Sequence, residues 1–450
     1  MKNLLSFLFS AVVILFNSLT AQEIASNDSV MRISLEDAKK FAFDNNYDII
    51  NAMKEIDIAR EKVKETAAIG LPQVSGSIAY NDFINIPTQL IPGEFFGEEA
   101  GTFIPVKFGT KYNMSLSATA SQLIFSGEYI IGLQAMRAIV DLSQKQHEKA
   151  LIELVQNVSQ SYYLVLIAER NKLIVDSLLE SLTEIRDANV ALYENGFAED
   201  IDVDQVNLLI SDLNATLMNI QNNLSVSKNM LKFQMGLKLE NEIELTDNLD
   251  DLLGKVDQEV LVQSGFDYRR NIDYRILQNQ QELTNLNLKR YKSLYLPRLY
   301  AFVNYAENAQ RNEWNFMDMT QQWYTTTIFG VQMDIPIFES GNRSAKINQV
   351  KIQLDQLEVT DNKLQAGLNI QYSTVRNNFI NAWKVMKNKE QGLELSQKIY
   401  DRTRLKVLEG VTSSIELQQI YTQFLNSERD YVMAVLDLLN NKLELERLNN

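Results

Sequence analysis

The sequence predicts a mainly α-helical chain with membrane β-strands and an internal duplication. Gly127 and Gly196 enclose a segment without proline, and Gly341 and Gly410 enclose a second one with the same separation of 69 residues. As a single helix, each segment would be roughly 100 Å long at 1.5 Å per residue. Other segments alternate apolar and polar residues, which is the period of a β-strand. Two equal helices of this length indicate a repeated, elongated architecture.

The composition excludes several classes of function. The 450 residues carry a net charge of -15, which argues against nucleic acid as a partner because phosphate binding needs a basic face. There is no cysteine, so neither a disulfide nor a lipid-modified N-terminal cysteine can form. One histidine, His147, leaves almost no material for zinc sites or histidine-dependent triads, and no phosphate-binding glycine motif occurs. We therefore expect no enzyme, no metal site and no cofactor.

Residues 1–21 have the pattern of a secretory signal peptide. Lys2 precedes an apolar run from Leu4 to Phe16, and small or polar residues lead to Ala21, after which we expect cleavage. The alternative, an uncleaved anchor helix, is less favoured because the run is short for a bilayer span. No later stretch approaches 18 consecutive apolar residues, so membrane insertion would have to use strands.

The first repeat is expected to cover residues 22–236. Ser34 and Asp37 predict a helix over residues 33–45, and helical spacing continues from Tyr47 to Ile69. Pro72 cannot continue that helix and begins a β-hairpin at about 73–124, whose two strands are joined by a long loop with five phenylalanines. The long helix follows at about 127–195, then a returning helix at 201–235 with Gly236 as its cap.

The second repeat is expected to cover residues 266–450, after an acidic and irregular connector at 237–265. It contains a helix, a hairpin at about 298–337, a long helix at about 341–409 and a returning helix at 415–448. The halves match residue by residue: Asn46 and Pro72 correspond to Asn271 and Pro297 at one offset of 225. After the shorter second hairpin the offset is 214, which relates Gly127 to Gly341.

Aromatic residues gather at the tip of the second hairpin. Trp314, Phe316, Trp323 and Tyr324 lie there, as expected for an aromatic girdle at a membrane interface. A soluble sheet with a sticky loop is the alternative. Each half supplies two strands, and four strands cannot close a barrel, while open edges are not tolerated in lipid. The pattern therefore requires an oligomer without selecting its number.

These residues resemble the TolC-like outer-membrane efflux proteins, the outer membrane factors of tripartite pumps. The resemblance extends from Ser34 to about Leu448 and is carried by four kinds of motif. They are Ser34-Leu35-Glu36-Asp37-Ala38 followed by Asn45 and Asn46, the Leu-Pro pairs at Pro72 and Pro297, the helix starts after Phe125 and Phe338, and the turn from Gly410 to Leu417. It implies a homotrimer with a transmembrane β-barrel of twelve strands in the outer membrane of a Gram-negative bacterium. It also implies a long periplasmic α-helical barrel.

The same resemblance implies a passive exit duct for small molecules, whose partners are a periplasmic adaptor (membrane fusion) protein and an inner-membrane pump. By position, the adaptor contacts are the two helix-turn-helix tips. The first tip is Gly196, Phe197, Ala198, Glu199, Asp200 and Ile201, and the second is Gly410, Val411, Thr412, Ser413, Ser414 and Ile415. Helix–strand junctions are implied at Pro72, Phe125, Gly127, Pro297, Phe338 and Gly341. The chain departs from the family at Glu199, where Ser or Thr is common, and at Val206 and Ile420, where Ala is common.

Two alternatives to the efflux duct stay open at this stage. One is the outlet of a type I polypeptide secretion system, and the other is a periplasmic coiled-coil scaffold without a pore. Alternating strands favour a duct, because a scaffold has no need of a lipid-compatible face. At the first tip, an acidic cluster of Glu194, Glu199, Asp200, Asp202 and Asp204 suggests a cation-favouring entrance. We favour the simpler interpretation that Asp200 and Asp202 cap the returning helix.

Overall fold

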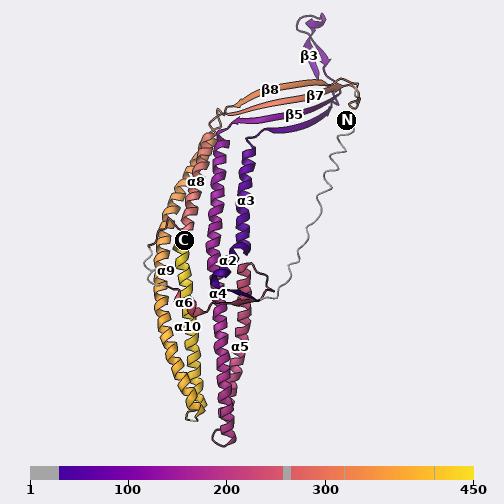
Figure 1. The fold of residues 1–450 in the computed structure, drawn as a ribbon. Coiled ribbons are helices and arrows are strands. Elements are labelled where there is room, and N and C mark those ends of the chain that lie inside the picture. The colour runs from indigo at the N-terminus through magenta and orange to yellow at the C-terminus, as the bar shows by residue number, and fades with distance from the viewer. Residues whose placement is uncertain (1–29, 257–264, 319, 410, 450) are drawn as a thin grey trace.

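The computed structural model describes residues 30–256, 265–318, 320–409 and 411–449. The molecule is elongated, with a sheet at one end and long helices that run from it to two turns at the other end (Figure 1). Among the described residues, no helix is both long enough and apolar enough to cross a bilayer. The predicted signal peptide and Gly410 lie outside the described residues.

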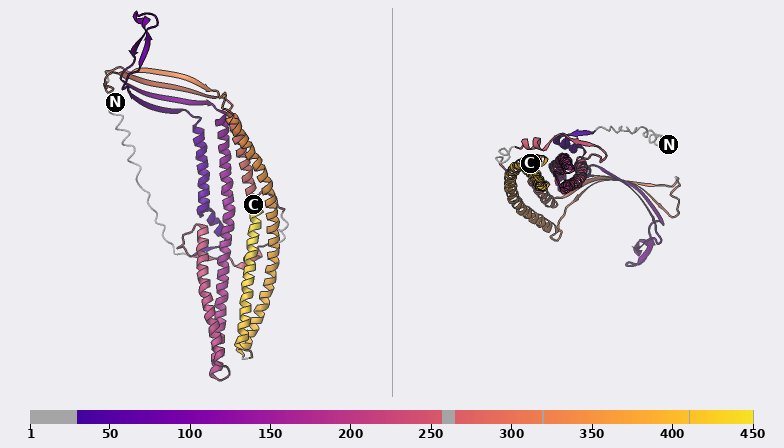
Figure 2. Two further views of the ribbon diagram at one scale, coloured as in Figure 1. Left: turned by 180° about the vertical axis from the view of Figure 1, so that it is seen from behind. Right: turned by 90° about the horizontal axis from the view of Figure 1, so that it is seen from below.

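The first half is built around α4 (Gly127–Glu194), a single helix of 68 residues. Beside it stand α3 (Tyr47–Ala68) and α5 (Asp200–Met235), one above the other (Figures 1 and 2). The short α2 (Leu35–Asn45) precedes α3, and Ser34 caps it by accepting a hydrogen bond from the Asp37 backbone N–H. Stacking two shorter helices along one long helix lets each half keep two packed columns over its full length.

The second half repeats this arrangement with α9 (Asn342–Leu408), α8 (Ile272–Ser293) and α10 (Ser414–Asn449). Helix α8 also lies along α4 of the first half, and polar contacts follow that seam. Lys149 pairs with Asp273 at 2.7 Å, and Arg275 pairs with Glu148 at 2.5 Å. The two halves are therefore joined side by side through α4 and α8.

Two buried asparagines hold the stacked helices end to end. The Asn46 side chain caps α3 by accepting from the Asp48 N–H at 2.8 Å, and its amide donates to the Gln234 carbonyl of α5 at 2.8 Å. Asn271 does the same in the second half: it accepts from the Asp273 N–H and donates to the Leu448 carbonyl at 3.2 Å. The duplication thus extends to individual hydrogen bonds.

The sheet has the strand order β2-β5-β7-β8, with all neighbours antiparallel. Its strands are β2 (Gln73–Asp82), β5 (Tyr112–Phe125), β7 (Arg298–Arg311) and β8 (Tyr324–Asp334). The hairpins of the two halves meet at β5 and β7, so β2 and β8 form the open edges. No helix covers either broad face of the sheet in Figure 1, and side chains such as Val74 and Phe329 are exposed by 77% and 73%.

The loop that joins β2 to β5 is more ordered than the sequence predicted. It contains β3 (Thr88–Pro92), a 3-10 helix η1 (Gly93–Phe96) and β4 (Phe103–Lys107), and β3 pairs with β4 in a separate two-stranded sheet. This small hairpin projects beyond the main sheet (Figure 1). Pro92 of β3 and Pro105 of β4 have no backbone N–H to donate. Both strands of a two-stranded ribbon are edge strands, where proline is tolerated, so these residues do not prevent pairing.

The connector is also more regular than predicted. Its β6 (Ile243–Leu245) pairs in parallel with β1 (Met31–Ile33), and α6 (Leu249–Gly254) follows. Residues 257–264 of the predicted connector lie outside the described part of the chain. Ile33, Ile243, Leu249 and Leu252 are buried, so these short elements pack as a belt against the middle of the helices.

Tyr162 of α4 fastens this belt. Its hydroxyl donates to the Asp247 carboxylate at 2.9 Å, the Leu35 N–H also donates to that carboxylate at 2.7 Å, and the side chain of Tyr162 is fully buried. The buried core consists of one cluster around the belt and a second one in the lower half, between the helices that lead to the tips.

Candidate functional site

The four-stranded sheet has one apolar face and one polar face. Paired positions on the apolar face include Ile78 with Leu116 and Val303 with Phe329. Paired positions on the other face include Ser77 with Ser117, whose hydroxyls lie 2.7 Å apart, and Asn304, whose amide donates to the Thr119 hydroxyl at 2.7 Å. A sheet of this kind can separate hydrocarbon from water, with the hydroxyl-rich face toward the water.

An aromatic cluster covers the outer end of the apolar face. Phe316 is buried and lies between Trp314 and Trp323, with ring centroids 6.3 and 6.4 Å away, and its ring meets the edge of Tyr80 at 6.0 Å. The predicted interface residues Trp314 and Trp323 therefore lie together. Tyr324 is paired with Asn308, so it belongs to the polar face of the sheet, apart from that cluster.

Two carboxylates lie on the apolar face near this outer end: Asp82, opposite Tyr112, and Glu307, opposite Leu116. Glu307 accepts hydrogen bonds from the hydroxyls of Tyr305, at 2.5 Å, and Thr325, at 2.8 Å. Below it on the same face lie apolar residues such as Val303 and Met333. A carboxylate with two hydroxyl donors fits the interfacial layer better than hydrocarbon, so it marks the outer limit of the apolar band.

The predicted junction residues lie where helices meet strands, but equivalent positions are held differently. A Cβ on Gly127 would come within 2.9 Å of Leu296 and 3.0 Å of Ser293, so this glycine permits close packing of α4 on the end of α8. Gly341 instead has a φ of 83° and caps α9. Pro72 and Pro297 precede β2 and β7, Phe125 ends β5, and Phe338 is exposed by 82%.

In the first half, the ring of Tyr129 packs against Gly70, whereas in the second half the aromatic residue stands at the position equivalent to Gly70. The Tyr129 hydroxyl donates to the Ala67 carbonyl at 3.2 Å, and a Cβ on Gly70 would lie 2.3 Å from that hydroxyl oxygen. The corresponding residues in the second half are Tyr295 and Arg343, and there the guanidinium of Arg343 lies 5.1 Å from the centre of the Tyr295 ring. Each junction therefore contains one aromatic ring. In the first half the ring belongs to the long helix α4, and in the second half it belongs to Tyr295, which lies just after the short helix α8.

We expect Gly70→Ala to destabilise the first junction by about 1–3 kcal/mol, because the added methyl overlaps the Tyr129 ring and overpacks the site. The measurement is the thermal midpoint of the helical circular-dichroism signal. Gly132→Ala is the matched control, because nothing lies within 4 Å of that position in α4. Adding Tyr129→Ala to Gly70→Ala should recover part of the loss, and an additive loss in the double variant would contradict the overlap.

The two helix-turn-helix tips expose apolar side chains at the end opposite the sheet. Phe197 and Val411 are exposed by 81% and 69%. At the first tip Gly196 has a φ of 80°, and the N–H of Phe197 donates back to the Leu192 carbonyl at 2.8 Å. At the second tip the N–H of Val411 donates to the Lys406 carbonyl, also at 2.8 Å. Both turns are closed by backbone hydrogen bonds, which leaves their side chains free to contact another molecule.

The remaining tip residues begin the returning helices. Ala198 and Glu199 precede α5, and Asp200 is its first residue, so the prediction that Asp200 caps the helix is wrong; Glu199 holds that position. The predicted role of Asp202 at the same end is confirmed, since its carboxylate accepts from the Glu199 N–H at 3.3 Å. Ile201 is exposed, as is Ile415 of α10.

At the second tip, Thr412 donates to the Glu416 carboxylate and the Ser413 hydroxyl accepts from the Glu416 N–H at 3.4 Å. Ser414 is the first residue of α10. Above the tips, two contacts link α4 to α9: the Ser181 and Tyr400 hydroxyls lie 3.1 Å apart, and Arg404 pairs with Glu184 at 2.5 Å. The two helical hairpins are thus fastened to each other close to the tips.

Sequence reasoning did not identify the polar junction near the belt, where Glu444 joins three helices. Its carboxylate accepts two hydrogen bonds from Arg447 of α10, at 2.5 and 2.9 Å. It also accepts from Gln156 of α4 at 3.2 Å and from Gln371 of α9 at 3.3 Å. These hydrogen bonds, those from Arg447 above all, hold the pKa of the Glu444 carboxyl below its usual value.

We expect Glu444→Gln to lower stability at neutral pH and to make stability less sensitive to acid. A lowered pKa in the folded state stabilises the fold above the pKa of the unfolded state, about 4.3, and this contribution is lost as the pH falls through the folded-state value. The measurement is the thermal midpoint between about pH 7 and pH 3. Glu98→Gln, in the exposed loop, is the control. A gap between wild type and Glu444→Gln that stays constant over that range would contradict the assignment.

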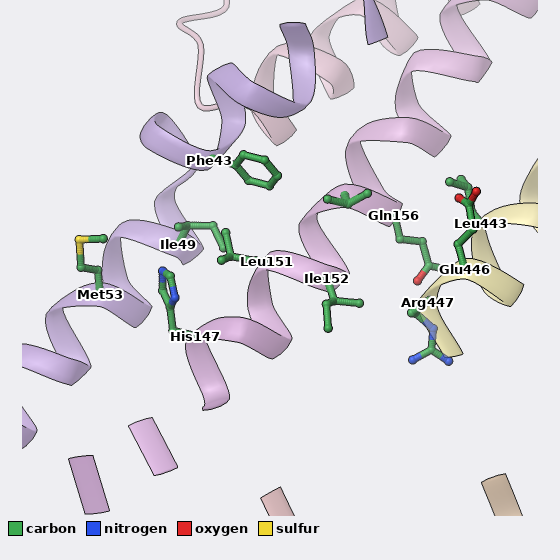
Figure 3. Close-up of a pocket in the computed structure, with 11 residues that line it drawn as sticks. Phe43, Ile49, Met53, His147, Leu151, Ile152, Gln156, Leu443, Glu446 and Arg447 are labelled. Atoms are coloured by element: carbon green, nitrogen blue, oxygen red, sulfur yellow. The ribbon is translucent and has the colours of Figure 1, made fainter. Parts of the chain in front are cut away.

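An apolar cavity of about 670 Å³ lies beside this junction (Figure 3). Phe43, Ile49 and Met53 line it from α2 and α3, and Leu151 lines it from α4. His147 also borders the cavity, as a residue within α4. Among the residues that the structure describes, no group of three or more His, Cys, Asp or Glu side chains is placed to hold a metal ion. Most of the cavity lining is apolar, and Gln156, Glu446 and Arg447 complete it.

Comparison with known proteins gives one family match and several matching folds. A family model described as outer membrane efflux protein matches residues 41–237 and 273–450. None of the curated proteins matches the sequence. The solved structure of CusC is similar, with a TM-score of 0.71 at 16% identity and 92% of each chain covered.

Two further structures are outer membrane channels. The Campylobacter jejuni CmeC channel has a TM-score of 0.67 at 15% identity, with 92% of this chain and 85% of its own covered. The open state of the Neisseria gonorrhoeae MtrE channel has a TM-score of 0.69 at 14% identity, with 92% and 88% covered. These matches confirm the predicted fold class, a duplicated helical chain with membrane strands, and likeness at such low identity concerns the fold alone.

Proposed function

The chain belongs to the outer membrane efflux protein family, and from that premise we propose that three copies form the exit duct of a tripartite efflux system. Members of this family are channels rather than enzymes. In the proposed assembly the strands of three copies form one closed barrel in the outer membrane of a Gram-negative bacterium. The helices extend that barrel into the periplasm as a tunnel, and small molecules pass through passively.

The observation that carries this proposal is the two-faced sheet with two open edges. Ile78 and Phe329, on the apolar face, are exposed by 74% and 73%, although both are large hydrophobic residues. Lipid would cover them in the assembly. Unpaired edge groups are not stable in hydrocarbon, so a single chain with four strands needs partner strands before it can span a membrane.

The energy for transport has to come from a partner, because a passive duct has no driving force of its own. We propose that an inner-membrane pump supplies it and that a periplasmic adaptor protein connects the pump to the two tips. The exposed apolar residues Phe197 and Val411 support this role for the tips. The turns that contain them, between α4 and α5 and between α9 and α10, lie at the end of the molecule farthest from the sheet (Figure 1).

The test combines the mass of the native particle with its conductance. We expect protein extracted from outer membranes in mild detergent to contain three chains, and we expect the particle to form ion-conducting pores in planar bilayers. Cells without the protein should become sensitive to toxic small molecules. A monomer or dimer in the soluble periplasmic fraction would overturn the pore. Loss of a secreted polypeptide with unchanged sensitivity to small molecules would favour the secretion outlet instead.

A further inference from the structure

The two open edges of the sheet are complementary in length and direction. β2 has 10 residues and runs away from the helices, whereas β8 has 11 residues and runs back toward them. In a ring of copies, β8 of one chain therefore meets β2 of the next chain in an antiparallel orientation. Pairing them would satisfy both rows of backbone groups that the single chain leaves open.

The alternation of the two faces restricts how these edges can pair. On β2, Ile78 belongs to the apolar face and Ser77 to the polar face; on β8, Phe329 belongs to the apolar face and Gly330 to the polar face. A slip of one residue would turn one strand over and place its apolar residues in the lumen. Allowed registers therefore differ by steps of two residues.

Closure of the barrel restricts the register further. Across the sheet, Val74 is opposite Ala120, Ala120 is opposite Val303, and Val303 is opposite Phe329. Val74 and Phe329 are therefore at the same level in one chain. In the ring, Phe329 faces a residue of β2 in the next copy, and the number of residues from Val74 to that residue is the displacement along the strands for one chain. That displacement, repeated in every copy, fixes the tilt of the strands, which is about 35–45° in membrane barrels.

With a rise of about 3.3 Å per residue and about 4.8 Å between strands, the arithmetic leaves two solutions. If Phe329 faces Ile78, the displacement is about four residues per chain and the tilt is about 35°. If Phe329 faces Tyr80, the displacement is about six residues per chain and the tilt is about 46°, at the upper limit of that range. The neighbouring registers on either side give about 19° and about 54°, both outside the range.

We propose that β8 of one copy pairs with β2 of the next so that Ser77 faces Gly330 or Gln332 across the lumen side of the contact. This interface rests on the proposed trimeric pore but goes beyond it, because it specifies which residues meet. On the polar face it places Ser77 and Ser117 of one copy beside the β8 positions Thr326, Ile328, Gly330 and Gln332 of the next copy.

The natural chain has no cysteine, so disulfide cross-linking can test the register on a clean background. Ser77→Cys would be combined in turn with cysteine at each position from 328 to 334, and the trimer oxidised in its membrane. Within one chain the two positions are three strand spacings apart, about 14 Å, which is too far for a disulfide. A link therefore joins two copies and yields a covalent trimer in denaturing gels.

We expect the strongest linkage at position 330 or 332, and the position identifies which tilt the barrel adopts. Strongest linkage at Ile328 or Asp334, or at the apolar-face positions 329, 331 and 333, would overturn the register. The Ser77→Cys, Ser117→Cys pair is the matched control, because those residues already face each other within one chain. A conducting trimer with the wrong cross-links would refute only the register, whereas a protein that fails to form trimers would refute the pore itself.

Discussion

Gly236→Ala is expected to unfold the middle of the molecule at a far lower temperature than the wild-type chain. Gly236 ends α5 with a φ of 73°, which costs an L-residue about 1–2 kcal/mol. A Cβ at this position would lie 2.0 Å from the Asn45 carbonyl oxygen and 2.5 Å from its carbon. Both are backbone atoms, so no side chain can move aside.

Relief of the overlap would have to separate α5 from the start of α3. That movement breaks the hydrogen bond from Asn46 to the Gln234 carbonyl, and Asn46 is buried. A buried donor that loses its partner costs about 1–3 kcal/mol, so together with the backbone strain we expect a total loss of about 2–5 kcal/mol. The measurement is the thermal midpoint of the helical circular-dichroism signal in detergent.

Gly101→Ala separates the two causes. Gly101 has a φ of 91°, but nothing lies within 4 Å of its added Cβ, so this variant carries the backbone strain alone. The difference between the two variants measures the overlap with Asn45. Equal midpoints for Gly236→Ala and Gly101→Ala would show that the stacked helix ends can move apart at no cost.

The long elements of this fold could be predicted because their signals are local and repeated. Proline-free segments of 69 residues and strict alternation in β5 define helices and strands without knowledge of distant contacts. Gly236 was predicted as a helix cap for the same reason, and the structure confirms it. The depth of its contact with Asn45 could not be predicted, because that contact joins residues far apart in the sequence.

The short elements could not be predicted because tertiary contacts create them. β1 and β6 have three residues each, too few to show a period, and they pair across more than 200 positions of the chain. The helix–strand junctions are similar in this respect, because Gly70 and Tyr295 occupy equivalent positions. Gly70 leaves room for the ring of Tyr129, whereas Tyr295 supplies the ring itself and Arg343 packs on it, and only these contacts explain the difference. Matching the halves by offset could have signalled that these positions compensate one another.

The tips show a further limit of sequence reasoning. Helix capping by acidic residues was predicted correctly in kind, but the cap lies at Glu199 rather than Asp200, one residue earlier. Helix ends are commonly uncertain by one or two residues in sequence patterns. The proposed contact with an adaptor is a property of the assembly, and a single chain provides only the exposed surface on which that contact would form.

Phe197→Asp combined with Val411→Asp is expected to abolish efflux in cells while the trimer and its conductance remain intact. Both side chains are largely exposed, so neither contributes to the core of the chain. Burial of such side chains against an adaptor contributes about 1.5–3 kcal/mol each. Loss of two of them per chain, about 3–6 kcal/mol, should weaken the complex by more than about a hundredfold, since about 1.4 kcal/mol corresponds to one factor of ten.

Three measurements separate a docking defect from a folding defect. The native mass and the single-channel conductance of the double variant should match those of the wild-type protein, and only the resistance of cells to toxic compounds should fall. Phe95→Asp, which adds an aspartate at a phenylalanine exposed by 81% in η1, at the other end of the molecule, should leave that resistance near the wild-type level. Full resistance in the double variant would mean that the adaptor binds elsewhere, and cross-linking from position 411 should then capture no adaptor. An intact pore with failed efflux is therefore the outcome that assigns the tips to the partner rather than to the fold.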